Sequence, residues 1–306
     1  MNVSTCILEY INIKEPFLKE STNARYTNLY INYIKDAFNQ IEIVNLTNYI
    51  IQNYCDQKIK EGVSLITIKE IVLLLKLATK RYNKLNELKP LTIDLDLPKI
   101  SSKRKIEVFS KNDIKVIINY ILLNDKLKFS GIIISLLTGI RIGEVCALKW
   151  TDIDLKKRII KIEKTLQRIC LKNQKSKIVI DKPKTKSSIR IIPIGNFLFD
   201  FLIDIKPNNR DFYVLTGNNS FKEPRSYRKI FANLLKKIKI KHIHFHALRH
   251  TFATRLIENK TDIKTISELL GHSSPNITIS IYVHSEFATK RKAIKELDKL
   301  ALKWKQ

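Results

Sequence analysis

Apolar residues repeat with a helical period along most of this chain, and this periodicity constrains its fold more than any other feature. In residues 26–38 they recur at i, i+4, i+7 and i+8, which places them on one stripe of a helix. Residues 46–59 and 66–85 repeat the same spacing. We therefore predict a small helical domain over residues 21–95, preceded by a short N-terminal extension, residues 1–20, in which no period is clear.

A second helical region follows a break in the pattern. Ser110 followed by Asp113 has the spacing of a capping box, which marks the start of a helix. From there the helical period continues to about residue 148 and is interrupted near Gly139. We therefore expect a second domain over residues 109–306.

Three short β-branched stretches lie inside this second domain. They are residues 158–164, 177–180 and 189–193, and turn residues separate them. The simplest interpretation is one three-stranded antiparallel sheet, with residues 183–188 at a hairpin tip. The chain returns to helical spacing from residue 227 onward. The expected fold class is therefore mainly α with a small β-sheet.

Positive charge is concentrated in the second domain and in the segment that leads to it. The chain carries 56 Lys+Arg against 29 Asp+Glu, a formal net charge of +27. Residues 1–100 contribute only +2, so residues 101–306 contribute +25. A polyanion is the natural partner of such a segment, and nucleic acid is favoured over an anionic membrane surface or a plain solvated surface. The expected linker, residues 96–108, contains Lys103, Arg104 and Lys105, which would bind a phosphate backbone.

Composition excludes several other classes of protein. The apolar runs fall far short of the roughly 20 residues that a membrane span needs. The four cysteines are scattered and form no C-x-x-C pair, so neither a disulfide framework nor a zinc site is expected. No motif for a metal ion or a nucleotide cofactor stands out, and we expect none. A cytoplasmic, nucleoid-associated protein fits this pattern.

Three phrases in the basic half carry groups suited to attack on a phosphodiester. They are residues 138–144, 246–250 and 271–272, the last followed by Tyr282. Taken singly, each has an ordinary explanation, because an Arg–Glu or His–Arg pair at i, i+3 is commonly a solvated helix face. Together they supply two guanidiniums, several imidazoles and a phenol.

The chemistry of phosphoryl transfer explains why these types matter together. A phosphodiester gains negative charge when a nucleophile adds, and the paired donors of Arg141 and Arg249 would stabilise it. The oxygen of Tyr282 could form a covalent intermediate that conserves bond energy, so that no ATP is needed. The leaving sugar oxygen needs a proton, which Lys184 at the expected hairpin tip could deliver.

Four sequence boxes in this order resemble the signature boxes of the tyrosine recombinases, the phage integrase family. The boxes are residues 138–150, the hairpin at 183–185, residues 246–250, and residues 270–274 leading to 282–284. The resemblance covers about residues 21–306. It implies an N-terminal core-binding domain of SAM-like type, a mixed α/β catalytic domain and a C-terminal exchange helix.

The resemblance also implies a role for each matching residue. Six are expected to be catalytic: Arg141, Lys184, His246, Arg249, His272 and Tyr282. Tyr282 would form a 3′-phosphotyrosine, the arginines would clamp the phosphate, and Lys184 would protonate the 5′-hydroxyl. His246 would act as general acid and base, and His272 would donate to the phosphate. Glu144 would orient the site from behind, and Lys186 rivals Lys184 as the acid and is otherwise a DNA contact.

The expected partners follow from the same resemblance. The two domains would clamp double-stranded DNA, and a homo-tetramer would synapse two sites and pass through a Holliday junction. A directionality factor or a host DNA-bending protein would be an optional further partner. We expect the tail over residues 288–304 to dock into a neighbouring subunit; folding back onto its own core is the alternative. Residues 1–20 are too short for the arm-binding domain of larger integrases.

We therefore expect a site-specific DNA recombinase that integrates and excises a phage or mobile element. A Xer-like resolvase of chromosome or plasmid dimers and a type IB topoisomerase share the same chemistry and stay as alternatives. A non-catalytic DNA-binding regulator is the alternative from a different class. A complete set of catalytic positions argues against it, because a regulator has no use for a nucleophile.

Overall fold

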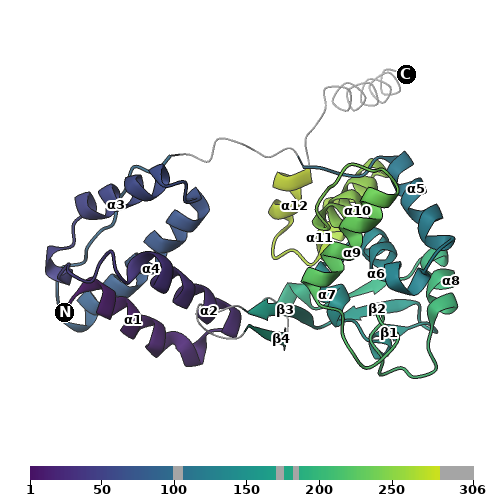
Figure 1. The fold of residues 1–306 in the computed structure, drawn as a ribbon, viewed down its shortest axis with the longest axis horizontal. Helices are drawn as coiled ribbons and strands as arrows, with labels where there is room; N and C mark the ends of the chain where they lie inside the picture. Colours follow the sequence, from purple (N-terminus) through teal and green to yellow (C-terminus); the bar gives the residue numbers. More distant parts are fainter. Residues whose placement is uncertain (99–105, 170–175, 182–185, 283–306) are drawn as a thin grey trace, which may run out of the picture. The chain divides into compact units, whose positions relative to one another are not determined.

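The structure is a computed structural model that describes residues 1–98, 106–169, 176–181 and 186–282 (Figure 1). The chain divides into two compact units, each described here by itself. The first contains Met1–Arg104 and Arg168–Val179, and the second contains Lys105–Gln167 and Ile180–Gln306. Both units are built mainly from helices, with short strands, which confirms the expected fold class.

The first unit is a helical bundle around one apolar core. Its helices are α1 (Val3–Lys14), α2 (Glu20–Leu29), α3 (Asn48–Lys60) and α4 (Leu65–Leu85), with the π-helical turn η2 (Tyr30–Ile34) and the 3-10 turns η1 (Glu15–Phe17) and η3 (Ile43–Asn45). The long helix α4 buries Ile68, Ile71 and Leu75 at a spacing of three and four residues, and packs against α1 and α3.

Residues 1–20 are part of this bundle, so the prediction of a short, patternless extension is wrong. Helix α1 buries Val3, Ile7 and Ile11, which lie at i, i+4 and i+8 on one face. The side chain of Asn2 caps the helix by accepting from the backbone N–H of Thr5 at 2.7 Å. The exposed apolar residues Leu8 and Ile13 hid this stripe in the sequence, because they spread apolar character around the helix.

The second unit surrounds one buried helix. Its helices are α5 (Lys111–Leu122), α6 (Lys126–Thr138), α7 (Ile142–Ala147), α8 (Asn196–Ile205), α9 (Pro224–Lys237), α10 (His246–Glu258), α11 (Ile263–Leu270) and α12 (Pro275–Tyr282). Helix α6 is the centre, because α5, α7, α8, α9 and α10 all pack on it. Ser110 and Asp113 form the predicted capping box of α5, and α6 ends at the predicted interruption, Gly139.

The strands of this part of the chain form two small sheets instead of one. β1 (Ile153–Asp154), β2 (Ile159–Ile162) and β5 (Arg190–Pro193) make a three-stranded antiparallel sheet that pairs Ile160 with Ile192. A 3-10 turn, η4 (Trp150–Asp152), leads into it. β3 (Thr165–Ile169) and β4 (Lys177–Asp181) make a separate pair. The predicted middle strand, 177–180, thus pairs with β3, a strand that the sequence analysis did not identify.

Burial accounts for the cysteines of the described segments. Cys6, Cys55 and Cys146 are free thiols inside the two cores, and burial raises the pKa of Cys146 to about 12. Within the part of the chain that the structure covers, no helix is both long and apolar enough to span a membrane. Over the same residues, no cluster of three or more His, Cys, Asp or Glu side chains could hold a metal ion.

Candidate active site

Arg141 stands where α6 gives way to α7. Gly139 ends α6 with a left-handed φ of 67°, and Arg141 is the N-cap of α7. Its guanidinium donates to Glu144 at 2.8 Å and to the backbone carbonyl of Gly271 at 3.2 Å. The side chain remains 36% exposed, so a ligand can reach it.

Glu144 lies behind Arg141 and is almost fully buried. Its carboxylate accepts the backbone N–H of Arg141 as well as the guanidinium, both at 2.8 Å. Arg190 donates to both carboxylate oxygens from the opposite side, at 2.9 and 3.1 Å. Burial alone would raise the pKa of Glu144, but the hydrogen bonds and charges of Arg190 and Arg141 lower it below its ordinary value. Glu144 is therefore an anion that holds two cations.

Arg249 projects from α10 into the protein and is 2% exposed. Its Nη1 donates to the carbonyl of Gly139 at 2.8 Å. Gly139 lies two residues before Arg141. This hydrogen bond therefore connects residues 246–250 on α10 to residues 138–144 at the α6–α7 junction. A Cβ on Gly139 would lie 2.5 Å from Phe252 Cδ1, so only glycine fits between these helices.

His246 is the first residue of α10 and lies one helical turn before His250. The two rings meet edge to face, with centroids 4.5 Å apart. Burial first, and then the charges of His250 and two arginines, lower the pKa of His246 to about 4. Burial and Arg249 also lower the pKa of His250. Near neutral pH, His246 is therefore an uncharged imidazole that can accept or donate a hydrogen bond.

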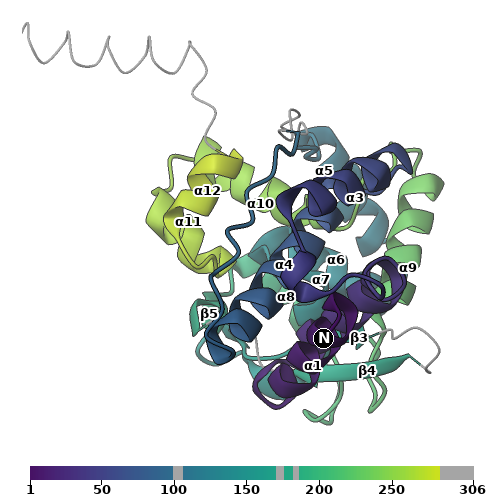
Figure 2. The same ribbon diagram turned by 90° about the vertical axis from the view of Figure 1, so that its left-hand side faces the viewer.

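His272 follows the left-handed cap of α11 at Gly271. Its Nδ1 lies 2.9 Å from Oγ1 of Thr278, a fully buried residue on α12. Burial first, and then the charges of Arg249, Arg141 and Arg190, lower its pKa to about 4. The same two arginines thus act on both histidines, which places all four groups in one electrostatic environment. Figure 2 shows α12 packed beside α11, and α12 ends at Tyr282.

A cleft of about 290 Å³ opens beside two of these residues. Its polar lining comes from Arg228, His242, His244, His246 and Arg249, and its apolar lining includes Phe231 and Phe245. His242 and His244 therefore line the same cleft as His246 and Arg249.

Several expected site residues lie outside the described part of the chain. They are Lys103, Arg104, Lys105 and Lys184, together with the tail over residues 288–304. For Lys186 and Tyr282 the structure describes the backbone: Lys186 begins the 3-10 turn η5 (Lys186–Ser188), and Tyr282 is the last residue of α12. Their catalytic and DNA-binding roles stay predictions.

Arg190 is a residue of this site that sequence reasoning missed. It begins β5 with its side chain 6% exposed, on the same face of the strand as the buried Ile192. A charged residue at a core-facing position of an alternating strand is a signal, because a buried charge needs a partner. That signal does not say which partner, and Glu144 lies 46 residues earlier in the chain.

The described geometry suits phosphodiester chemistry. An exposed guanidinium and a buried one, with two neutral imidazoles, offer donors to an anionic oxygen in a site partly removed from water. The backbone of the adjoining helix leads to a tyrosine, and a tyrosine oxygen can accept a phosphoryl group covalently.

Comparisons with known proteins agree with this chemistry. The chain is 31% identical to a "Tyrosine recombinase XerC-like" protein of Caldanaerobacter subterraneus subsp. tengcongensis, over 92% of this chain and 78% of that protein. It is 26% identical to the ICEBs1 integrase of Bacillus subtilis, over 88% of this chain and 75% of that protein.

Solved structures show the same fold. The Tn1549 transposon integrase in complex with a circular intermediate DNA superposes with a TM-score of 0.78, at 21% identity, covering 97% of this chain and 99% of that one. A lambda integrase tetramer bound to a Holliday junction gives a TM-score of 0.65 at 16% identity, covering 90% and 78%. The family model described as "Phage integrase family" matches residues 107–289. The chain therefore belongs to the phage integrase family and is a tyrosine recombinase.

Proposed function

We propose that the two arginines and two histidines of this site bind one scissile phosphate of duplex DNA. The observation that carries the proposal is the cross-bracing of the site. Arg249 is held by the carbonyl of Gly139, and Arg141 is held by the carbonyl of Gly271. Arg249 is thereby held by the segment that carries Arg141, and Arg141 by the segment that carries His272. These groups are therefore held together although they are far apart in sequence.

Tyr282 is the proposed nucleophile. Its oxygen attacks phosphorus, the bond to the 5′-oxygen breaks, and a 3′-phosphotyrosyl link forms while the tyrosine proton passes to a base. His246 is the proposed acceptor of that proton, because its imidazole is unprotonated at neutral pH and the negative charge of a bound phosphate would raise its basicity. Arg141 and Arg249 stabilise the charge that builds on the non-bridging oxygens. The 5′-hydroxyl of a partner strand reverses the reaction and reseals the DNA.

Lys184 is the proposed donor of the proton to the 5′-oxygen, with Lys186 as the alternative. A substrate with sulfur in place of that 5′-oxygen separates them, because a thiolate leaves without needing a proton. If a lysine is the acid, replacing it with alanine should slow cleavage of the substrate with the 5′-oxygen and leave cleavage of the 5′-sulfur substrate unchanged. Equal losses on both substrates, for both variants, would remove the lysine from this role.

Double-stranded DNA is the proposed substrate, held by the basic second unit together with Lys103, Arg104 and Lys105 where the first unit ends and the second begins. The net charge of +25 over residues 101–306 supports this, since each phosphate contact releases counterions. We propose a homo-tetramer on two synapsed sites. Light scattering of the purified complex should give four chains per two duplexes, and a stable one-chain complex that still recombines would contradict it.

The proposed biological role is integration and excision of a mobile element, with dimer resolution as the alternative. Similarity to the ICEBs1 integrase supports the first role. A plasmid assay distinguishes the two roles. One plasmid carries the joined ends of the DNA segment that encodes the chain together with the segment's chromosomal target, and the other carries two direct copies of a single chromosomal resolution site. Recombination of the first plasmid alone supports integration.

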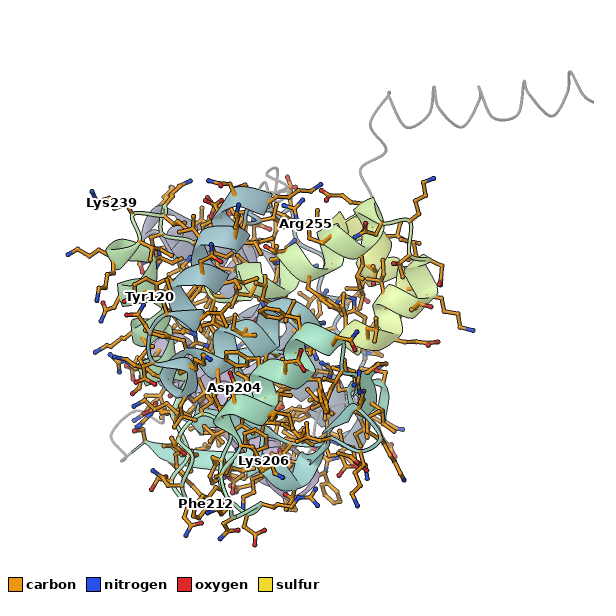
Figure 3. The ribbon with its side chains drawn as sticks, turned by 90° about the vertical axis from the view of Figure 1, so that its right-hand side faces the viewer. Tyr120, Asp204, Lys206, Phe212, Lys239 and Arg255 are labelled. Atoms are coloured by element: carbon orange, nitrogen blue, oxygen red, sulfur yellow. The ribbon has the colours of Figure 1, made fainter. Side chains whose placement is uncertain are left out.

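The experiment that tests the chemistry traps the intermediate. A duplex nicked just 3′ of the cleavage site loses its short 5′-hydroxyl fragment after cleavage, so the protein stays attached. Wild-type protein should form an adduct that survives detergent, and Tyr282→Phe should form none. Tyr120→Phe is the matched control, because it removes the phenolic oxygen of a different tyrosine, on α5 of the same unit (Figure 3). An adduct in Tyr282→Phe would refute the assignment.

A further inference from the structure

Arg190 has all its guanidinium nitrogens bound inside the protein. Nη1 and Nη2 donate to the two oxygens of Glu144, at 3.1 and 2.9 Å. Nε donates to the carbonyl of Leu269 at 2.7 Å, and Nη1 also reaches the carbonyl of Ser188 at 3.1 Å. The side chain is only 6% exposed. Arg190 is therefore placed to act through other residues and not by touching DNA.

Glu144 connects Arg190 to the phosphate-binding face. Each of its oxygens receives one hydrogen bond from Arg190 and one from Arg141. Arg190 and Glu144 are both buried, at 6% and 3% exposed, whereas Arg141 at the other end of this chain of charges is 36% exposed. The carboxylate cannot change orientation without losing bonds to both partners, so Arg190 restricts the position of Arg141.

Arg190 also braces the turn that leads to His272. A Cβ on Gly271 would lie 3.0 Å from Cδ and 3.1 Å from Nη1 of Arg190, so the guanidinium packs directly against this turn. The carbonyl of Gly271 accepts from Arg141, and Leu269, two residues earlier, accepts from Arg190. One buried side chain therefore contacts both the turn before His272 and the carboxylate behind Arg141.

Lysine could not make these contacts. An ammonium group presents one nitrogen, whereas the fork of arginine reaches two carboxylate oxygens and a carbonyl at once. The hydrogen bond from Arg190 to the carbonyl of Ser188 also ties Arg190 to the last residue of η5, the turn that follows the expected lysine loop.

We propose that Arg190 is a positioning residue for strand cleavage, which holds Glu144 and, through it, Arg141 in the orientation that binds the scissile phosphate. The proposal rests on the proposed function, because it needs Arg141 to act on that phosphate. It goes further by assigning part of the rate to a residue that never meets the substrate.

A double-mutant cycle on single-turnover cleavage of the nicked duplex tests this proposal. Arg190→Lys should cleave more slowly than wild type, by up to about 100-fold, because a displacement of about 1 Å in a catalytic group has that effect. DNA affinity should stay at the wild-type value. The double variant Arg141→Lys/Arg190→Lys should cleave no more slowly than Arg141→Lys alone, since Arg190 then has no correctly held arginine to act on.

Arg255→Lys is the matched control. Arg255 projects from α10 in the same unit (Figure 3) and likewise binds a glutamate, Glu258, and a backbone carbonyl, that of Phe109. These hydrogen bonds go to Glu258 and Phe109 and involve neither Glu144 nor Arg141, so Arg255→Lys should cleave at the wild-type rate.

The outcomes separate the proposal from the function on which it rests. Cleavage by Arg190→Lys at the wild-type rate, or factors for Arg190 and Arg141 that multiply in the double variant, would overturn the positioning role. If Arg190→Lys slowed cleavage only by unfolding the protein, its rate factor would multiply with that of Arg141→Lys. The cycle therefore distinguishes unfolding from a positioning role. Failure of the wild-type protein to form any adduct would instead overturn the proposed function, before any variant is compared.

Discussion

Gly139 has a left-handed backbone, leaves no room for a side chain, and holds the active-site residue Arg249 through its carbonyl. Its φ of 67° is left-handed, a region that costs an ordinary L-residue about 1–2 kcal/mol. A Cβ there would also lie 2.5 Å from Phe252 Cδ1 and 2.9 Å from Leu270 Cδ2. Forcing an extra methyl into a packed core costs a further amount of about 1–3 kcal/mol. Gly139→Ala should therefore lower the unfolding free energy by about 2–5 kcal/mol.

Gly217→Ala is the control that separates the two contributions. Gly217 lies in the same unit with nearly the same φ, 63°, but its Cβ would meet only the side chain of Leu127, at 3.2 Å. Replacing Gly217 with alanine should lower the unfolding free energy by the backbone contribution alone, about 1–2 kcal/mol. For a unit of this size 1 kcal/mol corresponds to about 2–4 °C, so the two melting temperatures should differ by about 2–12 °C.

Thermal denaturation and cleavage together complete the test. Below both transitions, Gly139→Ala should cleave the nicked duplex more slowly, by up to about 100-fold, because the carbonyl that holds Arg249 is displaced. Gly217→Ala should cleave at the wild-type rate. Equal melting temperatures for the two variants would refute the packing argument. Wild-type cleavage by folded Gly139→Ala would refute the coupling between this turn and Arg249.

Three further predictions concern the charges and caps of the second unit. Glu144→Gln leaves Arg190 buried without its counter-charge and should lower the unfolding free energy by about 3–5 kcal/mol in urea denaturation. Because the folded-state pKa of Glu144 is lowered, wild type should lose that stabilisation only as pH falls below the ordinary value of 4.5, and pH-independent stability would contradict the pairing. His246 and His272 have pKa values of about 4 when folded and an ordinary value of 6.5, so the unfolded chain binds more protons between these pH values. The unfolding free energy should therefore fall as pH drops from about 6.5 to about 4, and proton NMR of the free protein should titrate both rings near the lower value; midpoints near 6.5 would contradict their burial beside the arginines. Ser110→Ala removes the cap of α5 and should cost about 1 kcal/mol without changing the cleavage rate of the folded protein.

Local signals predicted the parts of the site that depend on neighbours in sequence. The break at Gly139 and the capping box at Ser110 are each set within a few residues, and the structure confirms both. Arg141, His246, Arg249 and His272 could be selected because their residue types and order match the chemistry and the family's boxes. The structure brings these four together.

Features that depend on distant partners could not be predicted. Strand alternation identified a strand near residues 177–180, but alternation does not choose a partner, and that strand pairs with β3. The core-facing position of Arg190 predicts a buried counter-charge without naming Glu144. In α1 the stripe of Val3, Ile7 and Ile11 is real, but exposed apolar residues around it blurred the period, so only packing against α4 reveals it.

Identification of the residue that carries DNA after cleavage tests the central claim most directly. The adduct formed on the nicked duplex is digested with protease and nuclease, and mass spectrometry locates the residual nucleotide. Tyr282 should carry a 3′-phosphate ester, and no other tyrosine, serine or cysteine should be modified. A nucleotide on any other side chain, or quantitative cleavage with free phosphate or hydroxyl ends and no adduct, would contradict cleavage through Tyr282.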